Sequence, residues 1–207
     1  MSIIFTKIEA APIGENTYVI KDESTGKCAV IDPGCMTASI NRFIYDGSGL
    51  EYILLTHSHW DHIAALNEYV SKYPDARVVA SFDEREMLID SSINHSARYT
   101  ESAISREADI YVSDNEELSL GNSKLRFIAT PGHTKGGMCI LVDDKLFSGD
   151  TLFLRSVGRT DLYGGSWQDL KASIQDKLFK LDGSTKVYPG HGPSTTIELE
   201  MRENPFV

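Results

Sequence analysis

Short apolar runs separated by polar turns predict a chain built from short strands and helices. Runs of β-branched and aromatic residues bounded by turn formers are typical of strands, and the first half has them at 16–20, 27–32, 52–56 and 76–81. The polar turn KDESTG between the first two runs predicts a hairpin. Helical spacing predicts one helix carrying Ile40, Phe43 and Ile44, and a second that runs on from Ala64 and ends at Pro74.

The second half repeats this pattern. Strands are predicted within 125–132, 136–150 and 185–192, with a tight turn at Asp143–Asp144, and helices at 167–181, after Ser166 as N-cap, and 195–204. The polar segment 91–109 is weakly periodic and predicts an irregular flap. Two such halves with antiparallel hairpins predict two mixed sheets packed together with helices outside. Composition alone supports α/β or α+β.

Composition and charge narrow the class of protein. The 207 residues are 41% hydrophobic and 24% charged and contain no linker, which favours one soluble globular domain over 1–207. The net charge of −10 disfavours nucleic acid and anionic membranes as partners. The three cysteines form no C-x-x-C pair and the start resembles no signal peptide, so we expect reduced thiols in the cytoplasm. No apolar run approaches the roughly 20 residues of a membrane span.

The stretch THSHWDH, residues 56–62, concentrates half of the six histidines of the chain. In an extended segment, residues i and i+2 point the same way about 6.6 Å apart, so His57 and His59 can reach one metal ion. Asp61 and His62 lie at the turn into the next helix and suit a second ion. Imidazole and carboxylate are ligands for zinc, iron and manganese, and we expect zinc, with iron or manganese as alternatives.

Three further candidate ligands follow predicted strands in Gly-rich turns: His133 in PGHT, Asp150 in SGD and His191 in PGHG. They complete one triad with His57 and His59 and another with Asp61 and His62, and Asp150 can bridge. Paired divalent ions roughly 3.5–4 Å apart hold a water or hydroxide whose pKa falls to about 7. The sequence therefore predicts a hydrolytic site without a Ser or Cys nucleophile. His95, in the polar segment, is assigned to solvent.

The chain resembles the metallo-β-lactamase superfamily in four motifs that occur in this order: THSHWDH, PGHT, SGD and PGHG. The resemblance extends from AVIDPG at 29–34 to the end of the chain. The resemblance implies an α/β fold, an αβ/βα four-layer sandwich of two mixed sheets with helices on the outer faces and the metal site at its edge. Within the superfamily, GHGP, VGRTDL and MRENPF are similar to a single-domain branch of glyoxalase II-like (hydroxyacylglutathione hydrolase-like) enzymes. This implies a small-molecule thioester substrate of the S-acylglutathione type, attacked by the bridging hydroxide, with Asp61 as a ligand that also holds the hydroxide in line.

Other residues are open to two interpretations. Asp32 in IDPG matches a family aspartate and either orients a histidine ligand or only makes a turn. Arg159 either recognises substrate or pairs with Asp161, and Lys135 either binds a substrate carboxylate or is a solvated surface lysine. Dedicated glyoxalase II enzymes carry a C-terminal helical domain, whereas only sixteen residues follow His191, so glutathione specificity stays open together with the oligomeric state.

The same residues allow other functions. A mononuclear iron persulfide dioxygenase shares GRTD but uses two histidines and one aspartate, and its last histidine usually lies outside a PGHGP context. A hydrolase of another small ester or phosphodiester is a further alternative. Seven candidate ligands argue against a purely structural site, which needs four closed ligands, and the acidic composition argues against a nucleic-acid hydrolase.

Overall fold

Two six-stranded β-sheets form the centre of the protein in this computed structural model, which describes residues 2–207. The first three strands of the first sheet run antiparallel and the last three continue it in parallel. In spatial order this sheet contains β1 (Ile3–Ala10), β2 (Glu15–Asp22), β3 (Cys28–Ile31), β4 (Leu50–Leu54), β5 (Arg77–Ser81) and β6 (Ile110–Val112).

The second sheet is also mixed. Its one parallel pairing joins β10 to β13, and the other neighbouring strands are antiparallel. In spatial order it contains β14 (Thr195–Thr196), β13 (Lys186–Pro189), β10 (Lys145–Gly149), β9 (Met138–Val142), β8 (Ser123–Ala129) and β7 (Glu117–Leu120). A separate two-stranded hairpin is formed by β11 (Leu152–Phe153) and β12 (Ser156–Val157).

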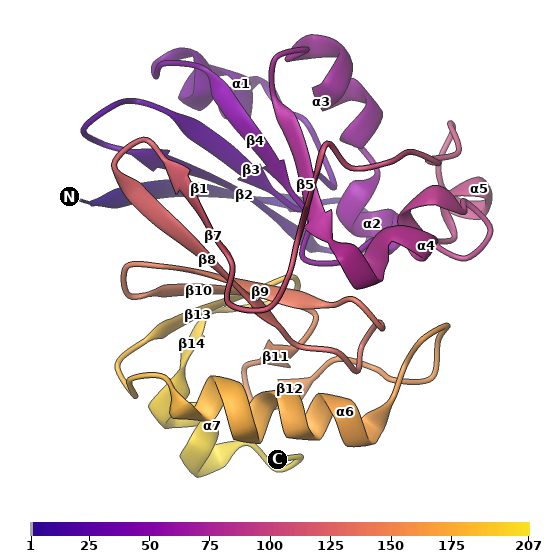
Figure 1. Ribbon diagram of the computed structural model, residues 1–207, viewed down its shortest axis with the longest axis vertical. Helices are drawn as coiled ribbons and strands as arrows, with labels where there is room; N and C mark the ends of the chain where they lie inside the picture. The colour runs from indigo at the N-terminus through magenta and orange to yellow at the C-terminus, as the bar shows by residue number, and fades with distance from the viewer. Residues whose placement is uncertain (1) are drawn as a thin grey trace.

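Helices cover the outer face of each sheet, so the chain forms four layers (Figure 1). Between strands β3 and β6 of the first sheet, the chain forms α1 (Ala38–Tyr45), α2 (Trp60–Ile63), α3 (Leu66–Lys72), the 3₁₀ turn η1 (Phe82–Glu84), α4 (Arg85–Ile89) and α5 (Ser96–Tyr99). The second carries α6 (Trp167–Ala172), which continues through the π-helical η2 (Ser173–Lys177) and the 3₁₀ turn η3 (Leu178–Lys180), and α7 (Ile197–Glu203).

Each pair of adjacent layers encloses its own apolar core. Alternate residues of a strand point to opposite faces, so Val19 and Ile53 pack under the helices of the first sheet while Ile20 and Leu54 face the second sheet. Between the sheets, the buried Phe147 ring lies edge-on to Phe5 and Tyr18, with ring centroids 5.9 and 5.1 Å apart. A third core lies between the second sheet and α6 and α7. Strands that are buried on both faces therefore hold the layers together.

The structure confirms the predicted α/β sandwich of two mixed sheets with outer helices. The hairpin of β2 and β3, the β9–β10 turn at Asp143 and the N-cap at Ser166 are also confirmed. The strands β1, β6, β7, β11 and β12 were not predicted, and residues 195–196, predicted as the start of the last helix, form β14. The segment 91–109 is irregular apart from the one-turn helix α5.

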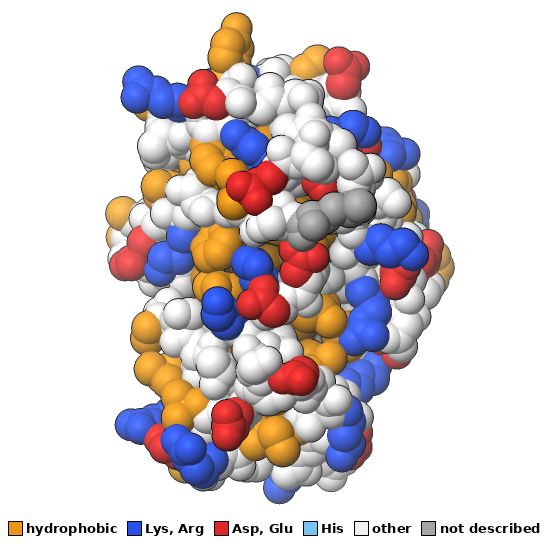
Figure 2. All heavy atoms as spheres, turned by 90° about the vertical axis from the view of Figure 1, so that its left-hand side faces the viewer, with side chains coloured by type: hydrophobic (Ala, Val, Ile, Leu, Met, Phe, Trp, Pro, Cys, Tyr) orange, Lys and Arg blue, Asp and Glu red, His pale blue; other side chains and the backbone are white. Residues whose placement is uncertain are grey.

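The side of the molecule where the N-terminus lies carries acidic and basic side chains in alternation (Figure 2). This view shows no large patch of one charge. Within residues 2–207, every helix is too short or too polar to cross a lipid bilayer.

Candidate metal centre

One loop of the first sheet presents four of the predicted ligands. It leaves β4, runs extended through His57 and His59, and turns into α2, where Asp61 and His62 occupy the first turn. His59 has extended backbone angles, with φ −63° and ψ 146°. The change from extended to helical backbone explains why the two pairs point to different positions.

Three separate loops of the second half bring the other ligands to the same place. His133 lies between β8 and β9, Asp150 follows β10, and His191 follows β13. Because β10 and β13 are parallel, their ends meet at one edge, and the Gly190 N–H donates to Gly149 O at 2.8 Å. The Asn16 N–H donates to Gly190 O at 2.7 Å, which joins this edge to the first sheet.

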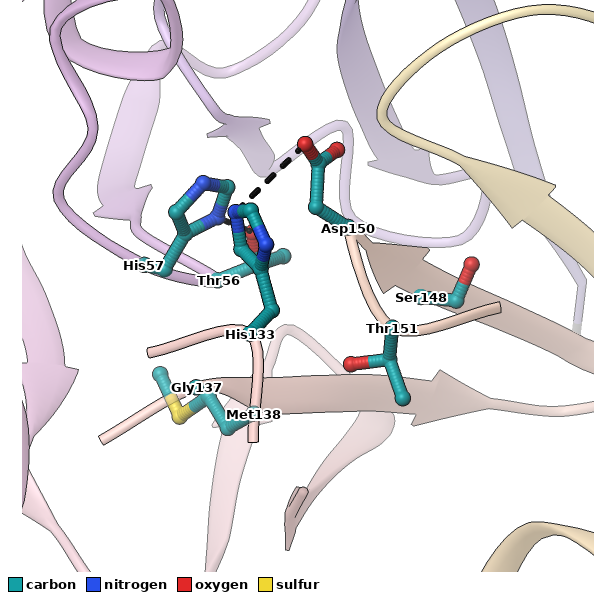
Figure 3. Close-up of a pocket in the computed structure, with 8 residues that line it drawn as sticks. All are labelled: Thr56, His57, His133, Gly137, Met138, Ser148, Asp150 and Thr151. Carbon is teal, nitrogen blue, oxygen red and sulfur yellow. Dashed lines mark hydrogen bonds and ion pairs between the residues drawn. The ribbon is translucent and has the colours of Figure 1, made fainter. Parts of the chain in front are cut away.

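His57, His59 and His133 form the first group of side chains that could hold a metal ion. Their ligand atoms all lie within 4.8 Å of one another, and His59 Nδ1 lies 2.9 Å from His133 Nε2. Figure 3 shows the rings of His57 and His133 beside the Asp150 carboxylate. Three imidazoles at this spacing are a donor set typical of zinc sites.

Asp61, His62 and His191 form the second group, again with ligand atoms within 4.8 Å. The Asp150 carboxylate lies between the two groups, with Oδ1 3.4 Å from His62 Nε2 and Oδ2 3.6 Å from His133 Nε2. A Cβ on Gly190 would lie 2.4 Å from Asp150 Oδ1. Only glycine therefore lets the His191 loop approach this closely.

The hydrogen bonds of the imidazoles fit a metal centre. The Nδ1 atoms of His57, His62 and His133 have partners at 3.1, 2.9 and 2.8 Å, namely Thr56 Oγ1, Asp32 Oδ2 and Arg159 O. By contrast, His57 Nε2, His62 Nε2 and Asp150 Oδ1 are buried without a hydrogen-bond partner. Metal-bound histidines characteristically use the outer ring nitrogen for a supporting hydrogen bond. The residues present therefore fit divalent metal ions.

Asp32 is placed to orient His62. Its carboxylate accepts the Thr56 N–H at 2.8 Å and the Thr56 hydroxyl at 2.6 Å, and lies 2.9 Å from His62 Nδ1. Although Asp32, His57 and His62 also lie within ligand distance of one another, these contacts already occupy both carboxylate oxygens. Asp32 also has a φ of +50°, so the turn interpretation and the orienting interpretation describe the same residue.

Burial and neighbouring charge set the protonation of the cluster. Burial and the surrounding imidazoles hold the pKa of His57 well below its usual range, and burial and His133 lower the pKa of His59 to about 3. Both rings are therefore neutral at neutral pH, as metal ligands must be. Burial also disfavours charge on His62, but Asp150, Asp61 and Asp32 outweigh this effect and raise its pKa.

The cluster opens into a pocket of about 250 Å³. Arg159 lies in its wall and makes a two-fold ion pair with Asp161, at 2.7 and 2.8 Å. Lys135 is exposed and is not among the described residues that line this pocket.

The prediction that His95 faces solvent is wrong. The residue is half-buried, lines the pocket, and its ring lies nearly parallel to that of His59 with centroids 6.3 Å apart. Its φ of +67° is uncommon for a residue other than glycine. A lone histidine in a weakly periodic segment gave no signal of this position, because the fold of 91–109 back toward the cluster is a tertiary feature.

The sandwich and the position of the histidine cluster at its edge define a class of metal-dependent enzyme. The family model of the Metallo-beta-lactamase superfamily matches residues 10–191, and the chain belongs to this superfamily. A curated relative, the probable metallo-hydrolase YqgX of Bacillus subtilis (strain 168), is 37% identical over 97% of this chain and 96% of its own length.

Solved structures agree with this assignment. The BLEG-1 B3 metallo-beta-lactamase is 36% identical, with a TM-score of 0.88 over 98% of this chain and 99% of that one. A di-iron-bound form of TTHA1623 is 30% identical, with a TM-score of 0.84 over 98% and 100%. ETHE1 from Myxococcus xanthus is 30% identical, with a TM-score of 0.79 over 98% and 83%.

Proposed function

We propose that this metallo-hydrolase holds two divalent metal ions and hydrolyses small thioesters of the S-acylglutathione type. The observation that carries the proposal is the pair of adjacent donor groups, with Asp150 between them, opening into one pocket. A single closed structural site needs four ligands, whereas seven side chains meet here. The solved di-iron form of TTHA1623 supports a two-ion site in a chain of this fold.

Bound metal ions would supply a Lewis acid and a water that is ionised near neutral pH. The chain's own residues then have three tasks. His57, His59 and His133 form one wall and Asp61, His62 and His191 the other, while Asp32 keeps the His62 ring in its orientation. The Asp61 carboxylate, 3.2 Å from His191 Nε2, faces the open side of the cluster, where it can accept a hydrogen bond from the attacking water.

The bond changes of the reaction are those of thioester hydrolysis. Water oxygen adds to the carbonyl carbon, the C–S bond breaks with its electron pair on sulfur, and the products are a carboxylate and a thiol. The pocket supports a small substrate, since about 250 Å³ accommodates an acyl group and part of a thiol. Asp161 occupies the Nε and one Nη of Arg159, and we assign the remaining guanidinium N–H groups to a carboxylate of the substrate. We assign Lys135, which lies outside the pocket lining, a weaker role in long-range attraction.

The donor set suits zinc, with iron or manganese as alternatives. Elemental analysis of the purified protein, followed by a thioester panel that includes S-lactoylglutathione and thioesters of simpler thiols, tests the proposal. We expect about two ions per chain and metal-dependent release of free thiol. Fully metallated protein that releases no thiol from any thioester would refute the thioesterase assignment and leave the fold untouched.

A second candidate is a mononuclear iron persulfide dioxygenase, which the similarity to ETHE1 and the shared GRTD motif support. The complete second group of Asp61, His62 and His191 favours hydrolysis over this alternative. One iron per chain together with oxygen uptake on glutathione persulfide would reverse the preference.

A further inference from the structure

Glu84 is a buried carboxylate that joins two ligand loops from opposite halves of the chain. It is the last residue of η1, directly behind β5, and is only 1% exposed. Oε1 accepts the Ser58 N–H at 2.8 Å, and Oε2 accepts the Thr134 hydroxyl at 2.9 Å and the Gly136 N–H at 3.0 Å. Ser58 lies between His57 and His59, and Thr134 follows His133.

We propose that Glu84 is a positioning residue for the first metal group: it fixes the distance between the His57–His59 loop and the His133 loop. The proposal rests on the metal centre proposed above. It assigns Glu84 no contact with substrate or metal, and its effect is exerted through Ser58 and Thr134.

The close packing of the His133 loop against η1 is an independent observation. A Cβ on Gly136 would lie 2.1 Å from the backbone nitrogen of Glu84, so this loop rests directly on the backbone that carries the carboxylate. At the other end of the same contact, the Met138 N–H donates to Thr56 O at 2.9 Å. The His57–His59 loop and the His133 loop are therefore joined at two places, by the hydrogen bond from Met138 to Thr56 and by Glu84.

The chemistry of the carboxylate explains why this position favours Glu. Burying a carboxylate is costly unless it is hydrogen-bonded, and three donors meet that need here. All three groups donate, so the central residue must accept on both oxygens. Glutamine has almost the same shape but accepts on one oxygen only, and its NH₂ must face either the Ser58 N–H or the Gly136 N–H.

The second metal group is held by other contacts. His62 is oriented by Asp32, and the His191 loop is attached to the first sheet through Asn16 and Gly190. Loss of the Glu84 acceptor should therefore affect the two groups unequally. A residue that only stabilised the fold would lower both metal affinities together, or neither.

Glu84→Gln tests this selectivity, with titration of the metal-free protein by Co²⁺ followed by its visible absorption and by chelator competition. We expect one binding step to weaken by about 10–100-fold, the range seen when residues that support metal ligands are replaced, while the other stays within about twofold. His59→Ala, which removes a ligand of the first group, identifies the spectrum of the affected step.

Glu200→Gln is a matched control. Glu200 is also fully buried and accepts the Arg155 N–H and the Asn204 amide, both at 2.9 Å, and the Thr195 hydroxyl at 2.5 Å, but it lies in α7. We expect both variants to lower the free energy of unfolding and only Glu84→Gln to change Co²⁺ binding. Two unchanged steps in Glu84→Gln, or equal weakening of both steps, would overturn the role of Glu84.

Thr134→Val provides a milder variant should Glu84→Gln fail to fold. It removes only the hydroxyl donor, so we expect weakening of the same step by a smaller factor, and an unchanged step would overturn the proposal. An unmodified protein that binds no Co²⁺ would overturn the metal centre and the role of Glu84 together. Loss of thioester turnover with intact Co²⁺ binding would instead concern the proposed reaction alone.

Discussion

The two halves of the chain build the metal centre in different ways. The first half supplies four donors from one loop, so their relative positions depend on a local change from extended to helical backbone at Trp60. The second half supplies one donor from each of three loops, and their positions depend on the pairing of β10 with β13 and on the packing of the second sheet against the first.

The positions of the donors therefore depend on local backbone geometry in the first half and on strand pairing in the second. Local backbone geometry sets the relative directions of the four donors of the first loop, and contacts with Asp32 and Glu84 hold that loop in place. The other three donors require strands far apart in the sequence to keep their register. Damage to the second sheet should therefore reach the metal centre more readily than equal damage to the outer core of the first sheet.

The largest effect is expected from Asp150→Ala, because this carboxylate faces imidazoles of both groups. Its oxygens lie 3.4 Å from His62, 3.6 Å from His133 and 3.8 Å from His191. We expect loss of both ions and a fall in kcat/KM of about 10⁴-fold, equivalent to about 5.4 kcal/mol. Elemental analysis and thiol release measure this, with the exposed Asp144→Ala as control. Full metal content in the Asp150 variant would contradict the bridging position.

A core substitution in β10 tests the dependence on register. Phe147→Ala removes a buried ring between the sheets and should lower the free energy of unfolding by about 3–5 kcal/mol in urea titration. We also expect weaker metal binding, because Asp150 and His191 follow β10 and β13.

Ile44→Ala is the matched variant for this comparison. Ile44 is buried between α1 and the first sheet, and its truncation should cost about 2–5 kcal/mol while metal affinity is retained. Equal loss of metal in both variants would contradict the distinction between the two halves.

Asp32→Asn tests whether the first loop can orient His62 without the hydrogen bonds of Asp32. Asparagine tolerates the positive φ of this residue but cannot offer His62 and Thr56 two acceptor oxygens. Metal affinity should fall by about 10–100-fold, which is about 1.4–2.8 kcal/mol. Isothermal titration with Zn²⁺ measures this, and an unchanged affinity would mean that the loop alone fixes His62.

The smallest effect is expected at the pocket wall. His95→Ala removes a ring that lies beside His59. His95 belongs to neither metal group. We expect KM for the best thioester to rise about 5-fold, equivalent to about 1 kcal/mol, with metal content and kcat retained. Lys124→Ala, at an exposed position of β8 outside the pocket lining, is the control and should leave steady-state kinetics unchanged; an unchanged KM in the His95 variant would contradict a role of this ring in substrate binding.

The sequence predicted those parts of the molecule in which local pattern and position coincide. His57, His59, Asp61 and His62 are adjacent in the chain, and His133, Asp150 and His191 each follow a strand in a Gly-rich turn. The pattern also predicted the β2–β3 hairpin, from two apolar runs on either side of a polar turn, and helix α1, whose buried Ile40 and Ile44 lie four residues apart.

Tertiary contacts explain what could not be predicted. Glu84 lies in the charged run FDERE, which reads as solvated surface, and only the fold shows that its carboxylate is buried. His95 reaches the pocket because 91–109 turns back toward α2. The edge strand β1 has only two of its eight residues buried, so its apolar pattern is weak.

Anomalous diffraction from crystals of the zinc-loaded protein, recorded on both sides of the zinc absorption edge, locates the metal ions themselves. We expect two peaks, one among the nitrogens of His57, His59 and His133 and one beside Asp61, His62 and His191, with Asp150 between them. A single peak, or peaks remote from these side chains, would contradict this expectation.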